Sequence, residues 1–375
     1  MNFSRKLLCD ISTKSKIMNR YGLISKSDNN MKAYFFSVPI LSQTTKKIVN
    51  SKIEKRDGVY YYNGSNCEVK IYNDRIMLCK GKEIIFLHFN AQKNIVLSED
   101  GSYLKAEDII FFPTFNGIII KQRGNKAKIK MESTTQKDVK NNSKNFAFMQ
   151  SKFEPVVTFN AMFAENRYRD TFYNIMLHSN KITDNLYELE LIASNENAFQ
   201  LTYDINMYEP KLIQDTTVES KNPCENNAYG NISFLGKSSC LGIQFLYSRV
   251  DMEKMDLPTN IQILNVKIHI PYYMINGNDF RISVPVKRFC SFGSNWNNKI
   301  PYSNDVLLGI RNNGYITFDI SKYVISKTGK WNPNEGFVIK SQGEHFSIIG
   351  TGDNYYTPQI IEITFKNKEK NNNEI

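Results

Sequence analysis

Two tryptophans are the side chains of this sequence best suited to hold a sugar ring. Trp296 lies in SNWNNKIP (294–301), where Asn297 and Asn298 follow it, and Trp331 lies among Gly and Pro turn signals in KTGKWNPNEG. A flat indole can stack on a sugar, and amides offer donors and acceptors to hydroxyl groups. We therefore predict a ligand site at Trp331, Trp296, Asn297 and Asn298, with Trp331 the more exposed. The alternative for Trp296 is burial at the end of a β-sandwich, with the asparagines capping the adjoining turn.

Acidic side chains could supply a metal site or a catalytic pair. Calcium takes oxygen ligands, and Asp215 and Asp353 are the acids that we expect to hold it if it binds, although no D-x-D-x-D-G loop is present. Glycoside hydrolysis needs two carboxylates across a cleft. The acids that qualify by type are Asp215, Glu219, Asp251, Asp319 and Asp353. No pair identifies itself, so we predict no catalytic residue, no enzymatic activity and no cofactor apart from the calcium alternative.

The sequence motifs considered next indicate no other type of enzymatic or binding site. The histidines at 88, 178, 269 and 345 fall in separate segments, outside any HExxH motif, and no Walker loop or dinucleotide fingerprint is present. The strongest basic run, KQRGNKAKIK (121–130), lacks aromatic residues, so we predict a strand and turn there and no nucleic-acid partner. No two cysteines form a CxxC pair, and free thiols are expected, with Cys67–Cys79 or Cys224–Cys240 as the alternative bridges.

Charge and hydropathy indicate the kind of partner. The net charge of +11 favours acidic partners such as an anionic polysaccharide, whereas the alternative is that the lysines are scattered surface charges. No apolar stretch is long enough to span a membrane, so no membrane insertion is expected. The start, MNFSRKLLCDISTKSK, lacks the apolar core of a signal peptide. The expected location is the cell surface or beyond, as on a spore, wall or phage particle, without a recognisable signal.

Short apolar runs between turn residues indicate β-strands. In VYYYNGSNCEVKIYN (59–73), an Asn-Gly turn at 63–64 precedes Cys67, Val69 and Ile71, which alternate with polar residues. This pattern predicts a hairpin with one buried face. The same alternation occurs in LYELELIA (186–193), LNVKIHI (264–270) and IIEITFK (360–366).

One segment predicts a helix. In AMFAENRYRDTFYNIML (161–177), Met162, Tyr168 and Phe172 recur at near-helical spacing. The alternative is two short strands around the polar ENRYRD.

Polar stretches suggest the boundaries between domains. STTQKDVKNNSKN (133–145) has one apolar residue and is predicted to be a linker. The expected organisation is a flexible basic arm (1–30), a β-rich domain (31–132), the linker (133–145), a β-rich segment (146–212), a β-sandwich (213–366) and a disordered tail (367–375). The fold class is therefore all-β.

The C-terminal part resembles the DNRLRE domain family. The similar blocks, in order, are DTTVESKNP with ENNAYGN (215–231), FLYSRVDMEKMDLP (245–258), LNVKIHI (264–270), SNWNNKIP (294–301), YITFDISKYV (315–324), EGFVIK (335–340) and TPQIIEITF (357–365). Residues that match the family pattern include Asp215, Asn227 and Gly230; Leu246, Tyr247, Arg249, Asp251, Leu257 and Pro258; Trp296, Asn297 and Pro301; and Phe318, Asp319, Ile320, Ser321 and Val324. The chain departs from the pattern at Val250, at Met252 and at GTGD (350–353).

The resemblance implies a jelly-roll β-sandwich similar to carbohydrate-binding modules, as in wall-associated and disaggregatase-related proteins of bacteria and archaea. It also implies that Asp251 and Asp319 accept backbone N–H groups at turns. We therefore predict a non-enzymatic, surface-associated protein that binds a polysaccharide. The alternatives are a structural building block of a coat or appendage that self-assembles or binds protein partners, and a polysaccharide-degrading enzyme.

Overall fold

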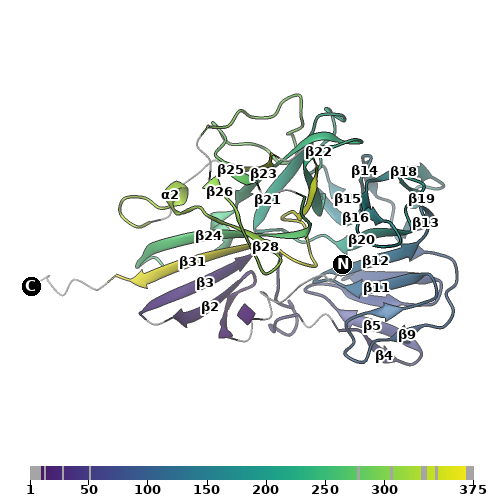
Figure 1. Ribbon diagram of the computed structural model, residues 1–375. Coiled ribbons are helices and arrows are strands. Elements are labelled where there is room, and N and C mark those ends of the chain that lie inside the picture. Colours follow the sequence, from purple (N-terminus) through teal and green to yellow (C-terminus); the bar gives the residue numbers. More distant parts are fainter. Residues whose placement is uncertain are drawn as a thin grey trace, which may run out of the picture. The chain divides into compact units, whose positions relative to one another are not determined.

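The chain forms two compact, almost entirely β units. The structure, a computed structural model, describes residues 10–11, 14–27, 29–49, 52–276, 279–304, 307–330, 336–342 and 345–368. Unit 1 comprises Pro39–Pro210 and Tyr229–Asn231, and unit 2 comprises the described residues of Asn2–Val38, Lys211–Ala228 and Ile232–Ile375. The predicted all-β class is confirmed (Figure 1).

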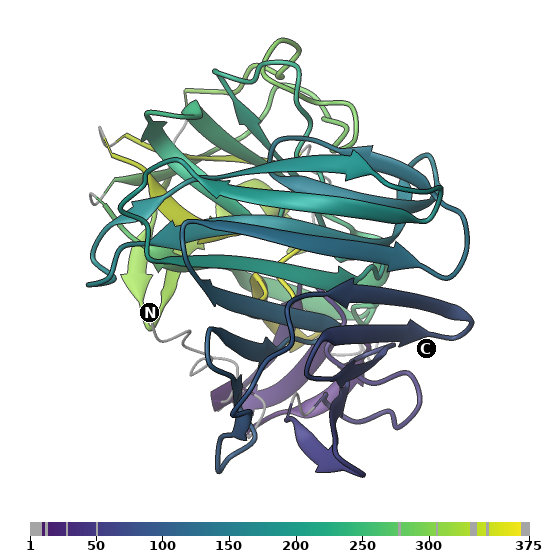
Figure 2. The ribbon, with the colours of Figure 1, turned by 90° about the vertical axis from the view of Figure 1, so that its right-hand side faces the viewer.

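Unit 1 is built from antiparallel strands that run side by side in Figure 2. Their bounds are β4 (Glu54–Arg56), β5 (Val59–Asn63), β6 (Glu68–Ile71), β7 (Arg75–Lys80), β8 (Glu83–His88), β9 (Val96–Leu97), β10 (Leu104–Lys105), β11 (Ile109–Pro113), β12 (Gly117–Arg123), β13 (Lys126–Ser133), β14 (Asp138–Asn141), β15 (Asn145–Ser151), β16 (Glu154–Glu165), β17 (Phe172–Tyr173), β18 (Ile175–Lys181), β19 (Leu186–Ala193) and β20 (Gln200–Met207). One sheet has the order β14-β15-β16-β20-β12-β11-β10-β9, with β17 beside β16, and the other has the order β18-β19-β13-β8-β7-β6-β5-β4.

The two sheets of unit 1 share one apolar core. Val69 and Leu189 from one sheet lie in the same buried cluster as Ile118, Phe159 and Tyr203 from the other. Each of these side chains is at most 1% exposed. Because inward-facing side chains of both sheets meet in one cluster, unit 1 is a β-sandwich.

The hairpin predicted at 59–73 is confirmed. Strands β5 and β6 pair antiparallel, and the N–H of Gly64 donates to the carbonyl of Cys67 at 2.8 Å. Val69 and Ile71 are buried, as the alternation predicted. A Cβ atom at Gly64 would lie 2.7 Å from the carbonyl oxygen of Phe115, so the turn leaves no room for a side chain there.

The helix predicted over 161–177 is wrong. Strand β16 continues to Glu165, and after a turn the chain enters β17 and β18. The apolar residues at 161–164 are buried because both faces of β16 are covered, whereas Tyr168 is 82% exposed in the turn. The Asn166 side chain closes this turn, accepting from the N–H of Asp170 at 3.2 Å. The near-helical spacing was produced by a doubly buried strand followed by a polar turn, which is the alternative that the sequence allowed.

Unit 2 contains the remaining elements. Their bounds are β1 (Lys16–Asn19), β2 (Gly22–Ser27), β3 (Asn30–Phe36), β21 (Ile213–Glu219), β22 (Ile232–Ser238), β23 (Gly242–Val250), η1 (Met252–Lys254), β24 (Ile261–Met274), β25 (Phe280–Ser283), β26 (Leu307–Leu308), β27 (Ile310–Asn312), β28 (Tyr315–Asp319), α2 (Ser321–Val324), β29 (Phe337–Ser341), β30 (Ser347–Gly350) and β31 (Ile360–Asn367). The strand order is β1-β2-β3-β31-β24-β30-β22-β23-β29-β25-β26, with β28 beside β24, β27 beside β28 and β21 beside β23.

Unit 2 is a jelly-roll-like β-sandwich. Its core joins Phe35 of β3, Val266 of β24 and Ile363 of β31 with Leu246 of β23 and Ile339 of β29 in one buried cluster. Figure 1 shows β3, β31 and β24 lying next to one another on one side of this unit, in purple, yellow and green. The inner faces of the two halves of the strand order therefore pack against each other.

A β-bulge changes one prediction for β24. Val266, Ile268 and Ile270 are buried as predicted, but Leu264, predicted to share their face, is 40% exposed. The pairing of β24 with β31 shifts register between Ile263 and Asn265. The extra residue of a bulge breaks the period-two alternation, so Leu264 turns outward.

The polar segments at 1–30 and 133–145 contain strands. Residues 16–27 form β1 and β2 at the edge of unit 2, and β14 is the edge strand of its sheet in unit 1. Edge strands can be polar because they face solvent, which explains why both segments resembled an arm or a linker. The division between units falls after Val38 and after Pro210 instead of within 133–145. In the described ranges, no helix is long and apolar enough to cross a membrane.

Candidate functional site

A polar row crosses the outward face of the sheet formed by β3, β31, β24 and β28. Tyr34 pairs with Glu362, Glu362 with Lys267, and Lys267 with Asp319 across successive strands. Residues directly opposite each other on neighbouring strands project to the same face. The sheet therefore places two acids and a lysine in one line.

This row forms part of a cavity of about 560 Å³, which we call the cleft. Its lining consists of Lys32, Lys267, His269, Leu307, Leu308, Ile310, Asn312, Asn313, Thr317, Asp319 and Glu362. A second cavity of about 310 Å³ shares Lys32 and includes Tyr34. The cleft thus combines cations, carboxylates, amides and a hydroxyl with an apolar rim.

A hydrogen-bonded chain holds one part of the cleft. The Nε2 atom of His269 lies 3.2 Å from Oε2 of Glu362, and its Nδ1 atom lies 2.9 Å from the hydroxyl of Thr317. The ammonium of Lys32 donates to Oε1 of Glu362 at 2.9 Å. Both carboxylate oxygens of Glu362 are therefore bound, which orients Lys32 and His269 on the face.

These contacts determine the ionisation of Glu362. Burial alone would raise its pKa, but the hydrogen bonds from His269 and Lys32 and the charge of Lys32 lower the pKa to about 2. The hydrogen bond to Glu362 in turn raises the pKa of Lys32. The pair is therefore ionised across the neutral pH range and offers fixed charges to a ligand.

The rim of the cleft is apolar and exposed. Leu308 of β26 is 64% exposed and Ile310 of β27 is 72% exposed. Asn312 is the last residue of β27, and Asn313 lies in the turn between β27 and β28. Exposed aliphatic groups beside paired donors and acceptors are the mixture that a ligand with one apolar face and many hydroxyls requires.

Trp296 lies elsewhere, in a separate aromatic cluster. Its half-buried ring packs 5.5 Å from the ring of Phe245 at an interplanar angle of 31° and joins a core of Val218, Tyr247 and Ile300. The ammonium of Lys299 sits 4.0 Å from the centre of the indole ring. A lysine covers the indole surface on which a sugar would stack, so these contacts favour the structural alternative for Trp296.

The asparagines beside Trp296 shape their own loop. The side-chain oxygen of Asn298 accepts from the N–H of Asn295 at 2.7 Å, and its amide donates to the carbonyl of Gly293 at 2.8 Å. The amide of Asn297 lies 3.4 Å from the sulfur of Cys224. Both side chains are exposed, and their role toward a ligand stays a prediction. Trp331 lies outside the described residues.

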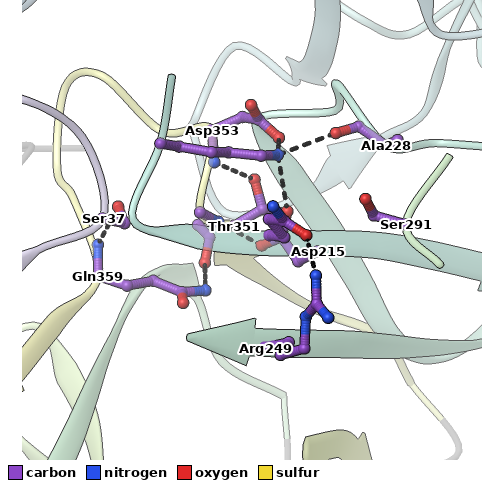
Figure 3. Close-up of polar contacts among 12 residues, drawn as sticks. Ser37, Asp215, Ala228, Arg249, Ser291, Thr351, Asp353 and Gln359 are labelled. Carbon is purple, nitrogen blue, oxygen red and sulfur yellow. Dashed lines mark hydrogen bonds and ion pairs between the residues drawn. The ribbon is translucent and has the colours of Figure 1, made fainter. Parts of the chain in front are cut away.

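Asp215 and Asp353, proposed as calcium ligands from the sequence, do lie together. Figure 3 shows both carboxylates turned toward the same point, beside Ala228. The ammonium of Lys211 occupies that point: it contacts Oδ2 of Asp353, lies 3.4 Å from Oδ1 of Asp215 and donates to the carbonyl of Ala228 at 3.0 Å. A lysine thus supplies the cation that the acids bind. Within the described residues, no group of three or more His, Cys, Asp or Glu side chains is placed to hold a metal.

Asp251, expected to accept a backbone N–H, makes no side-chain capping bond to η1, and its carboxylate lies 3.1 Å from the ammonium of Lys254. The Oδ1 atom of Asp319 accepts from the N–H of Ser321 at 3.0 Å, which is the turn contact expected from the family pattern. The segment at 121–130 forms the end of β12, a turn and the start of β13, as predicted. Five described cysteines carry free thiols: Cys67, Cys79, Cys224, Cys240 and Cys290.

The cleft and Lys211 were not predicted from the sequence. Two segments whose apolar residues predicted buried strand faces, LNVKIHI and IIEITFK, also supply polar residues of the cleft. These residues are Lys267, His269 and Glu362. The polar residues at the outward positions were visible in the sequence, but their proximity depends on the pairing of β24 with β31 and with β28. Lys211 was not singled out, because only one of its partners, Asp215, is close to it in sequence, and the other, Asp353, is 142 residues away.

The chain matches no protein-family model and no curated protein.

Proposed function

We propose that unit 2 is a carbohydrate-binding module and that a polysaccharide chain lies in the cleft, with no reaction taking place. The observation that carries the proposal is the composition of the cleft: Lys32, Lys267, Asn312 and Thr317 offer donors, Glu362 and Asp319 offer acceptors, and aliphatic side chains form the rim. Sugars need paired hydrogen bonds to hydroxyls together with an apolar contact for their C–H face.

The balance of charge in the cleft favours a neutral or weakly charged sugar. Two lysines, Lys32 and Lys267, stand against two carboxylates, Asp319 and Glu362. The overall charge of +11 would still raise the local concentration of a polyanion near the surface. We therefore distinguish specific binding in the cleft from a salt-sensitive attraction to the whole surface.

Retention of the full chain on immobilised polysaccharides tests this proposal. The panel comprises a neutral glucan, a neutral xylan and polygalacturonate, each at low and at moderate salt. Retention on a neutral polysaccharide that survives moderate salt supports the proposal. Retention on polygalacturonate alone, lost as salt is added, would overturn it.

Assembly is the second candidate function, and one observation favours it. Leu308 and Ile310 lie on short strands that end the pairing of their half-sheets, and both are more than half exposed. Exposed apolar residues on edge strands are a route to pairing with another chain.

Sedimentation of the full chain without sugar over a range of concentrations distinguishes the binding module from the building block. A constant monomer mass supports the binding module, and a mass that grows with concentration supports a building block. Either function suits a protein exposed on a cell, spore or phage surface.

A further inference from the structure

A lysine and two aspartates are buried together in unit 2. The side chains of Lys211, Asp215 and Asp353 are 2%, 1% and 5% exposed, respectively. The ammonium of Lys211 contacts one carboxylate oxygen of each aspartate. Burying three ionisable groups is costly unless they form a specific arrangement, so the cluster calls for an explanation beyond stability.

The two aspartates are held differently. Asp215 is in β21, and its Oδ2 atom accepts the backbone N–H of Gly352, a bond that stabilises its ionised form. Asp353 follows β30 in the loop before β31, and its Oδ2 atom is the one in contact with the lysine nitrogen. One acid is therefore placed to carry protons, and the other presents its carboxyl group to the amine.

Burial also favours the uncharged forms of these groups. Desolvation raises the pKa of Asp353, against the attraction of Lys211, to about 7, and desolvation raises the pKa of Asp215 as well. Desolvation by itself would lower the pKa of Lys211, although the charges of Asp353 and Asp215 raise it overall. The raised pKa of Asp353 favours its protonated carboxyl group, the form whose Cγ atom an amine can attack, whereas the charges of the two aspartates hold the proton on Lys211 until one carboxylate accepts it.

We propose that Lys211 and Asp353 join through an intramolecular isopeptide bond and that Asp215 relays the protons. Lys211 first gives one proton to the carboxylate of Asp215. The neutral amine then attacks the Cγ atom of the protonated Asp353 carboxyl, forming the N–C bond. Asp215 passes its proton to the oxygen and takes a proton from the nitrogen. The C–O bond then breaks, and that oxygen leaves as water.

The atoms and charges of this step balance. An ammonium, a carboxylic acid and a carboxylate become an amide, a water molecule and a protonated Asp215. No oxidant, reductant or activating group is needed. The Asp215 carboxyl remains beside the new amide, where it can hydrogen-bond to it.

The bond would tie the segment that leads into β21 to the loop between β30 and β31. These positions are 142 residues apart, so the bond would close a loop that spans most of unit 2. A covalent link of this kind restricts the unfolded chain as a disulfide does, but it is not broken by reduction. It therefore suits a surface protein whose described cysteines are free thiols.

Mass spectrometry of the denatured full chain tests the proposal independently of sugar binding. The expected mass is lower than the sequence mass by one water, and a digest should contain a branched peptide that joins Lys211 to Asp353. A chain at full mass, with both residues recovered in unlinked peptides, would overturn the proposal. Because the wild-type chain is measured, no variant has to fold for this result.

Three variants assign the roles. Lys211→Met and Asp215→Asn should each restore the full mass, since one lacks the amine and the other lacks the relay. Asp353→Asn should still form the bond but lose ammonia in place of water. Lys121→Met, which removes another buried lysine, is the matched control and should keep the branched peptide. A branched peptide in Asp215→Asn would overturn the role of Asp215.

Discussion

The imidazole of His269 and the carboxylate of Glu362 lie 3.2 Å apart on neighbouring strands, and both line the cleft. The hydroxyl of Thr317 holds the other nitrogen of the ring, and the ammonium of Lys32 holds the other oxygen of the carboxylate. The side chains that would face a ligand are thus oriented before any ligand arrives. Such preorganisation reduces the entropy that binding would otherwise cost.

Replacing Glu362 with Gln should change the response of unit 2 to acid. The pKa of Glu362 is lowered from 4.5 to about 2, so its contribution to stability is fully present above pH 4.5 and is lost as the pH falls toward 2. We expect the midpoint of urea unfolding of the wild type to fall between pH 4.5 and 2 by more than that of Glu362→Gln. Equal slopes in the two proteins would contradict the assigned contacts.

Asp204 of unit 1 should give the opposite pH dependence. Burial raises its pKa from 3.8 to about 7, even though the amides of Asn160 and Asn206 donate to it at 3.0 and 2.7 Å. An acid with a raised pKa binds its proton more tightly in the folded state, so stability declines as the pH rises from 3.8 to 7.

The variant Asp204→Asn should remove this decline. We expect its calorimetric transition to shift less between pH 5 and pH 8 than that of the wild type, which moves to lower temperature at pH 8. The difference should amount to a few kcal/mol at most, since one pKa unit corresponds to about 1.4 kcal/mol. A wild-type transition that is as stable at pH 8 as at pH 5 would refute the protonated Asp204.

Trp296→Ala should cost stability and leave sugar binding unchanged. The half-buried ring packs against Phe245 and the core around Tyr247, and we expect a loss of about 1–3 kcal/mol in the free energy of unfolding. Affinity for the polysaccharide, measured by titration of the folded variant, should match that of the wild type. Loss of binding without loss of stability would instead place the ligand on Trp296.

The alternation of apolar and polar residues predicted many of the β-strands. LYELELIA and IIEITFK became β19 and β31, with their predicted apolar residues buried. Two predictions from local patterns were wrong because of tertiary structure. Strand β16 is covered on both faces, so its apolar residues followed a helix-like spacing, and a bulge in β24 turns Leu264 outward. Polar composition was mistaken for a linker where β14 forms the edge of a sheet.

The candidate sites were harder to predict from the sequence than the fold was. Asp215 and Asp353 were named together, but the position of Lys211 between them depends on its contact with Asp353, which is 142 residues away in the chain. The cleft depends on the registers of β24 with β28 and with β31, which bring Thr317 and Glu362 to His269 from opposite sides. Such registers depend on long-range pairing, and local periodicity does not encode them.

Calorimetric titration of the full chain with the polysaccharide it retains tests the cleft most directly. The comparison is between the wild type, Lys267→Met in the cleft and Lys237→Met, which removes an exposed lysine of β22 outside the cleft and so matches the change in net charge. We predict at least a tenfold loss of affinity for Lys267→Met, about 1.4 kcal/mol, and wild-type affinity for Lys237→Met. Equal affinity in all three proteins would contradict the assignment of the cleft as the binding site.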